Sequence, residues 1–188
     1  LLVADYRNHR VLIYDEIPTE NGASADLVIG QSALTNATYG TAANRLICPQ
    51  GVFFDGNKLF ITDSSNSRVL IYNSIPVANN ASANIVVGQA SMTANGGYAA
   101  VNKLSMPYSV FSDGEKLFIP DYSNNRVLIY NEIPTENGAS ADVVIGQNVF
   151  YSRVANNGGE VNSNTSYWPM SSFFDGTRFF VADTLNHR

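Results

Sequence analysis

The feature that most constrains this chain is the unit Asp-x-x-Asn-x-Arg, which occurs four times. The copies are Asp5–Arg10, Asp63–Arg68, Asp121–Arg126 and Asp183–Arg188. The first three begin 58 residues apart, and the last step is 62 residues. A fixed period of this size, with the same turn chemistry in every copy, is typical of repeat architectures. We therefore expect one small structural unit to be used several times.

Other landmarks keep the same period: the pairs Asp-Gly, Ile-Pro and Gly-Gln, and one proline. They begin at Asp55, Asp113 and Asp175, at Ile17, Ile75 and Ile133, at Gly30, Gly88 and Gly146, and at Pro49, Pro107 and Pro169. The four extra residues of the last step lie between Gln147 and Pro169, in a loop. Residues 14–31 and 130–147 differ at only two positions, which indicates duplication with little later specialisation.

Composition favours a folded, β-rich domain and disfavours several kinds of partner. Hydrophobic residues make up 45% of the 188 residues and charged residues 14%, which argues against disorder. A net charge of −5 disfavours nucleic acid and anionic membranes, whose affinity for proteins comes from clustered Lys and Arg. No apolar run approaches the roughly 20 residues of a membrane span, so no membrane insertion is expected. The single Cys48 excludes an internal disulfide framework.

Each full repeat is expected to contain four short strands. In the second repeat these are residues Gly51–Asp55, Lys58–Thr62, Val69–Tyr72 and Asn84–Val87. Asp-Gly between two apolar runs is a strong hairpin signal, and the short connections suit antiparallel neighbours. Runs such as Arg-Val-Leu-Ile-Tyr have no polar face, yet no helical pattern lies nearby to cover them. A small antiparallel sheet covered on both faces by similar sheets satisfies both observations, and such a sheet is a β-propeller blade.

The combined pattern resembles a known repeat family. Pro-x-x-Val-x-x-Asp-Gly-x-x-Leu-Phe-Ile-x-Asp-x-x-Asn-x-Arg-Val-Leu-Ile-Tyr is similar to the NHL repeat, named for an Asn-His-Leu signature. The outer copies read Asn-His-Arg at 8–10 and 186–188, whereas the inner copies carry Ser67 and Asn125 in place of the histidine. The added Ile-Pro to Gly-Gln stretch resembles a longer variant common in large bacterial exported repeat proteins. The resemblance implies a propeller, most often six-bladed, that serves as an interaction platform.

We therefore expect an all-β fold of four-stranded antiparallel blades, with about three blades in this chain as a fragment of a six-bladed ring. The expected blades are residues 49–88 and 107–146, with partial blades at 1–30 and 169–188 and inter-blade loops at 31–48, 89–106 and 147–168. Because Leu1–Arg10 is in phase with Phe179–Arg188 and the chain starts without Met, we interpret it as a window of a longer array.

The signature residues are expected to hold turns rather than to form a site. An Asp side chain can cap a turn, and each Arg can pair with that Asp or with a backbone carbonyl. The predicted structural residues are Asp5, Asn8, Arg10, Asp63, Asn66, Arg68, Asp121, Asn124, Arg126, Asp183, Asn186 and Arg188. The only histidines, His9 and His187, occupy equivalent turns too far apart to share a metal, and no metal or other cofactor is expected.

The inter-blade loops differ most between copies and are the expected place for binding. Aromatic and Arg residues are common at binding hot spots, and loops on a rigid scaffold commonly carry function. The candidate binding residues are Tyr39, Arg45, Tyr98, Lys103, Tyr151, Arg153 and Trp168. The alternative is that these residues only pin the loops to the blades. Cys48, Met106 and Trp168 precede the recurring proline, and we expect this position to fill apolar space in the core.

No catalytic constellation stands out, so the leading interpretation is a non-enzymatic scaffold that binds a protein or glycan partner. The low charge and the Asn-, Ser- and Thr-rich loops favour a larger secreted or cell-surface protein. One alternative is a metal-dependent enzyme of the six-bladed lactonase-like or lyase-like kind, with ligands supplied by blades outside this chain. Another is a structural unit that continues head to tail into further blades or copies, as an extracellular array or filament.

Overall fold

The computed structural model describes all 188 residues and contains four antiparallel sheets joined by loops and short 3-10 helices. The first sheet has β1 (Leu2–Asp5), β2 (Arg10–Ile13) and β3 (Leu27–Ile29). The second has β4 (Pro49–Phe54), β5 (Leu59–Asp63), β6 (Arg68–Tyr72) and β7 (Ile85–Val87). The third has β8 (Phe111–Ser112), β9 (Leu117–Asp121), β10 (Arg126–Tyr130) and β11 (Val143–Ile145). The fourth has β12 (Pro169–Phe174) and β13 (Phe179–Asp183).

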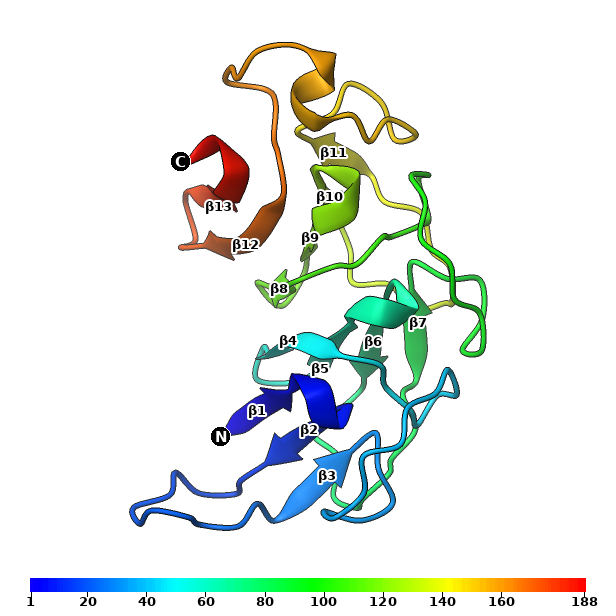
Figure 1. The fold of residues 1–188 in the computed structure, drawn as a ribbon, viewed down its shortest axis with the longest axis vertical. Helices are drawn as coiled ribbons and strands as arrows, with labels where there is room; N and C mark the ends of the chain where they lie inside the picture. Colours follow the sequence, from blue (N-terminus) through cyan, green and yellow to red (C-terminus); the bar gives the residue numbers. More distant parts are fainter.

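The sheets follow one another along an arc (Figure 1). β1, β4, β8 and β12 lie on the concave side of the arc, whereas β3, β7 and β11 lie toward the convex side. A 3-10 helix follows β1, β5, β9 and β13 in turn, namely η1 (Tyr6–Asn8), η2 (Ser64–Asn66), η3 (Tyr122–Asn124) and η5 (Thr184–Asn186), and the first three lead into β2, β6 and β10. A fifth, η4 (Ala155–Gly158), lies in the last loop. None of these helices has the length and apolar character needed to cross a membrane.

The all-β class and the antiparallel pairing expected from the sequence are confirmed, with differences at the strand ends. β6 begins at Arg68 rather than Val69, because Arg68 pairs with Asp63 across the turn. β4 begins at Pro49, two residues early, and a register shift follows before Val52. β8 contains only two residues, so the third sheet has a shorter first strand than the second.

The central strands are buried on both faces. Every residue of β5, β6 and β9 is buried. One apolar cluster joins Val11 and Ile29 of the first sheet to Leu59 and Leu70 of the second, and a similar cluster joins the second sheet to the third. Each sheet therefore covers its neighbour, which explains why Arg-Val-Leu-Ile-Tyr carries no polar face.

The outer edge of a sheet is covered by the repeat that follows it. Val28 of β3 donates its N–H to Asn79 Oδ1 at 2.9 Å, and its carbonyl accepts the Asn80 N–H at 3.0 Å. Val86 of β7 makes the same two bonds with the Asn-Gly pair of the third repeat, at 2.9 and 3.0 Å. Unpaired edge strands tend to pair with other chains. The Ile-Pro to Gly-Gln stretch therefore seals the preceding sheet.

We expect Gly88→Ala to lower the free energy of unfolding by about 2–4 kcal/mol, through a backbone cost and a steric cost. Gly88 has a φ of +87°, and an added Cβ would lie 2.6 Å from Leu104 Cδ1. Gly56→Ala is the matched control, because Gly56 has a φ of +98° with nothing within 4 Å of an added Cβ. The control should cost about 1 kcal/mol. If urea unfolding gave the same loss of unfolding free energy for both variants, it would contradict tight packing at Gly88.

Candidate functional site

The Asp-x-x-Asn-x-Arg signature forms an ion-pair network in each of the four repeated 3-10 turns. In the second repeat, Asp63 Oδ2 accepts hydrogen bonds from Arg68 Nε at 2.6 Å and from Asn66 Nδ2 at 2.8 Å. Asp63 Oδ1 accepts the backbone N–H of Ile47 at 2.7 Å. The sequence predicted that the Asp caps the backbone of the turn, but Asp63 makes no such capping bond. Instead, the Asn66 side chain donates a hydrogen bond to the carboxylate and links it to the turn.

Arg68 uses all five of its N–H donors. Besides the bond to Asp63, Nη1 donates to the carbonyl oxygens of Thr41, at 2.7 Å, and Met92. Nη2 donates to the carbonyl oxygens of Ala42, at 3.1 Å, and Arg45, at 3.0 Å. These carbonyls belong to the loop before the second sheet and to the loop after it. One guanidinium therefore fixes two inter-sheet loops to the same turn.

In the two inner copies of this network the ion pair is excluded from solvent, whereas in the two outer copies it is partly exposed. The side chains of Arg68 and Arg126 are fully buried, whereas that of Arg10 is 17% exposed and that of Arg188 is 39% exposed. Burial raises the pKa of the Asp63 carboxyl, and the Arg68 guanidinium opposes that rise. The same two effects act on the pKa of Asp121.

The recurring Gln is a second anchor, whose role the sequence analysis left unassigned. Gln31, Gln89 and Gln147 are all buried. Nε2 of Gln89 donates to the carbonyl of Ser67 at 2.9 Å and to that of Gly96 at 3.1 Å. The Gln thereby ties the turn to the loop that leaves the sheet.

In the first three turns, the residue between Asn and Arg hydrogen-bonds to the residue that precedes the next recurring proline. The three pairs are His9 with Cys48, Ser67 with Met106, and Asn125 with Trp168. Both members of each pair have a left-handed backbone. The side chain of the turn residue accepts the backbone N–H of its partner at 3.1, 3.5 and 2.9 Å, respectively. Each turn thus positions the entry to the next sheet.

The expectation that Cys48, Met106 and Trp168 fill the core is wrong. Cys48 and Met106 are half-buried, and Trp168 is 37% exposed. Leu46 and Leu104, two residues before Cys48 and Met106, are fully buried and occupy the space between sheets instead. The side chains before the proline therefore belong to the surface near the turns.

The histidines lie in the turns, as their sequence positions require. The His9 ring lies edge-on to Tyr39, with 5.5 Å between centroids, and His9 Nδ1 is 3.7 Å from Cys48 Sγ. His187 is exposed. No group of three or more His, Cys, Asp or Glu side chains is placed to hold a metal ion.

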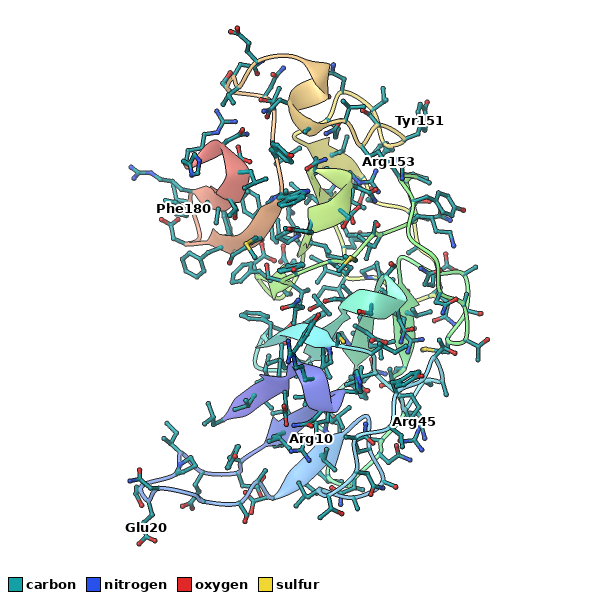
Figure 2. All side chains as sticks on the ribbon, viewed as in Figure 1. Arg10, Glu20, Arg45, Tyr151, Arg153 and Phe180 are labelled. Carbon is teal, nitrogen blue, oxygen red and sulfur yellow. The ribbon has the colours of Figure 1, made fainter.

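The candidate loop residues do not converge on one site. Arg45 Nη1 donates to Thr38 Oγ1 at 3.0 Å, so this Arg pins its own loop. At the equivalent position, Lys103 Nζ donates to Gln89 Oε1 at 3.3 Å and lies 5.5 Å from the Tyr98 ring centroid. Arg45, Tyr151 and Arg153 lie along the convex side (Figure 2). Of the seven candidates, the structure joins only Trp168 to a larger cluster.

That cluster, here called the aromatic row, consists of four rings in contact, Tyr108, Tyr122, Tyr167 and Trp168, together with Tyr6, whose hydroxyl lies near Cys48 and Tyr108 but whose ring makes no stacking contact with them. Tyr108 and Tyr122 stack with 4.2 Å between ring centroids and 25° between planes. Trp168 lies 5.0 Å from Tyr122 and 5.5 Å from Tyr167. Tyr6 and Tyr122 belong to η1 and η3, and the other three flank the recurring proline. The row therefore gathers residues from the first, third and fourth units.

Most polar groups of the aromatic row make no hydrogen bond within the protein. These are the hydroxyls of Tyr108, Tyr122 and Tyr167 and the indole N–H of Trp168, whereas the Tyr6 hydroxyl lies within hydrogen-bonding reach of the Cys48 thiol. The nearby Cys48 thiol, more than any other group, raises the pKa of Tyr6, and the Tyr108 hydroxyl adds to the rise. Burial raises the pKa of Tyr122, and its tyrosine neighbours add to it. A raised pKa keeps the hydroxyls of Tyr6 and Tyr122 protonated at physiological pH, so both can donate a hydrogen bond.

The residues of the aromatic row are visible in the sequence, but they occupy several different positions within the repeat. Tyr6 and Tyr122 share a phase with Ser64 and Thr184, whereas Tyr108 shares one with Gln50 and Met170. The loops differ between copies in length and composition, whereas the aromatic residues beside the turns differ only at single positions of the repeat.

Comparison with known proteins leaves the family open. No family model matches the chain, and a search of curated proteins finds no significant match.

We expect Arg68→Ala to lower the free energy of unfolding by about 3–5 kcal/mol, because it leaves Asp63 charged and buried without its partner. Arg10→Ala is the matched control in a solvent-accessible copy of the same turn, and should cost about 1 kcal/mol or less. Urea unfolding followed by circular dichroism measures both. Similar losses for the two variants would show that burial does not set the strength of this network.

Asn125→Ala should loosen Trp168, because it removes the acceptor of the Trp168 N–H and a donor to the Arg153 carbonyl. Trp168 is the only tryptophan, so acrylamide quenching of its fluorescence reports the change directly. We expect stronger quenching and a stability loss of about 1–2 kcal/mol. Ser67→Ala alters the equivalent bond to Met106 and should leave the quenching unchanged.

Proposed function

We propose that this chain is a run of NHL-type propeller blades that acts as a non-enzymatic scaffold and binds a protein partner through the aromatic row. Sheets that cover one another on both faces, and their succession along an arc, support the propeller. The observation that carries the binding proposal is the cluster of contacting rings Tyr108, Tyr122, Trp168 and Tyr167, whose hydroxyls and indole N–H make no hydrogen bond within the protein. Tyr and Trp residues in such a surface are the side chains enriched at protein interfaces.

The geometry of the rings favours a protein over a glycan. Tyr108 and Tyr122 stack on one another, so their faces are partly occupied and the row offers ring edges and hydroxyls to a partner. Tyr and Trp bury large contact areas while losing few rotatable bonds. A sugar ring would need open aromatic faces to stack on.

The support beneath the row suits a preorganised binding surface. Trp168 is held through its backbone by Asn125, and Asp183 Oδ1 accepts the Tyr167 N–H at 2.7 Å. The turns that carry Tyr6 and Tyr122 are closed by ion pairs of 2.7 and 2.8 Å. A surface held in place before binding loses less conformational entropy when the partner arrives. We place this scaffold outside the cell or at its surface, on the low charge and the polar loops.

Panning a displayed peptide library against the protein tests the proposal. Calorimetry of the selected peptides should show binding that weakens about 30-fold, or by 2 kcal/mol, in Tyr122→Ala. Tyr151→Ala is the control, because Tyr151 is 77% exposed on the convex side. Peptides that bind Tyr122→Ala as tightly as the wild type would contradict the site. Binding on a glycan array with no selected peptide would contradict the partner class.

A further inference from the structure

The contacting rings of the aromatic row carry several hydrogen-bond donors close together. The hydroxyls of Tyr108, Tyr122 and Tyr167 make no hydrogen bond within the protein but are open to solvent, whereas the unbonded hydroxyl of Tyr72 is buried. The hydroxyls of Tyr108 and Tyr167 lie close enough to that of Tyr122 to raise its pKa. Trp168 adds an indole N–H, which can only donate. The row therefore presents a compact group of donors to a partner.

The rings also form an angled apolar surface around Trp168. Trp168 is 37% exposed and is the most exposed of the four contacting rings. Its ring is tilted by 31° to that of Tyr122 and by 70° to that of Tyr167, with ring centroids 5.0 and 5.5 Å apart. Two rings that meet at a steep angle form a corner, and the compact ring of a proline suits such a corner.

The charged groups of the turns beside these rings are already paired. Asp121 and Arg126 form a fully buried ion pair, and Asp183 and Arg188 pair at 2.8 Å. Arg7, near Tyr6, is a single charge at the margin of the row. Phosphorylated and acidic segments are recognised by clusters of Arg, and nucleic acid by clustered Lys and Arg. The row thus favours an uncharged partner that offers hydrogen-bond acceptors.

We propose, as a step that rests on the proposed function, that the aromatic row binds a proline-rich segment in the polyproline II conformation. Such a segment has no internal hydrogen bonds, and its prolines have no N–H, so its carbonyls are acceptors without matching donors. The tyrosine hydroxyls and the indole N–H supply those donors, while a proline ring packs into the corner beside Trp168. Aromatic-lined surfaces bind proline-rich segments in this way, since the segment is ordered before it binds.

The dimensions and the support of the row suit a short segment. A polyproline II helix advances about 3.1 Å per residue and completes a turn in about 9 Å. Successive ring centroids along the row are 4.2, 5.0 and 5.5 Å apart, so roughly four to six residues can contact all four rings. Asn125 and Asp183 hold the backbones of Trp168 and Tyr167. Both partners therefore lose little conformational entropy on binding.

Decaproline, titrated in calorimetry and in fluorescence, is the probe that tests the proposal. Trp168 is the only tryptophan, so contact with the peptide should shift its emission and reduce its quenching by acrylamide. A ten-residue Gly-Ser peptide has the same length but is flexible, and it should bind about tenfold more weakly or less. The all-D form of decaproline has the same composition with the opposite helical hand, and should also bind about tenfold more weakly.

Conservative variants separate the donors from the rings. Tyr122→Phe keeps the ring and removes one hydroxyl, so the affinity for decaproline should fall about fivefold. Trp168→Phe removes the indole N–H and part of the ring surface, and calorimetry should show a loss of about tenfold. Tyr151→Phe is the matched control, because Tyr151 is 77% exposed on the convex side, and its affinity should be unchanged. Circular dichroism confirms that the variants fold.

The outcomes distinguish this inference from the proposed function. If the panned peptides bind through Tyr122 but are not enriched in proline, and decaproline does not bind, the inference fails and the protein-binding site stands. Equal binding of decaproline and its all-D form, or equal affinity of the wild type and Tyr122→Phe for decaproline, would also overturn the inference. Stronger binding of a uridine decamer than of decaproline would assign the row to nucleic acid and overturn both proposals.

Discussion

The structure depends on an ion pair that is fully excluded from solvent. Asp63 and Arg68 have no exposed side-chain surface, and neither charge could remain there alone. The cost of removing them from water is offset by their mutual attraction and by a full set of hydrogen bonds. Because those bonds reach Thr41 and Met92, in two different loops, the pair fixes tertiary structure as well as the turn. Asp121 and Arg126 repeat the arrangement one sheet further on.

The position of the aromatic row follows from these turns. A left-handed residue ends each 3-10 helix, and its side chain holds the backbone that enters the next sheet. Tyr122 lies in η3, and Asn125, which ends that helix, holds the Trp168 backbone, so the turn itself places the two rings side by side. Because that bond uses the backbone N–H of Trp168, a different side chain at this position can keep it.

Periodicity and patterning predicted most of the fold. The recurring Asp-x-x-Asn-x-Arg signature located the turns at η1, η2, η3 and η5, and apolar runs without a polar face predicted sheets covered on both sides. The left-handed backbone at Cys48 was not predictable, because nothing in its sequence requires a positive φ at a non-glycine residue. The backbone N–H of Cys48 donates to His9 Nδ1, a contact with a residue 39 positions earlier that the local sequence does not reveal. The candidate site was harder to predict, since the aromatic row combines residues from several repeats that only the folded chain brings together.

The outer edges of β3 and β7 are each covered by the repeat that follows in the chain, so protection of the sheets runs in one direction along the sequence. Val28 finds its partner Asn79 only 51 residues later in the chain. During synthesis, the outer edge of each newly made sheet stays uncovered until the next repeat has been made. That exposed edge is the surface that a chaperone or a neighbouring nascent chain would contact first. We therefore expect the units to become protected in order from the N-terminal one onward.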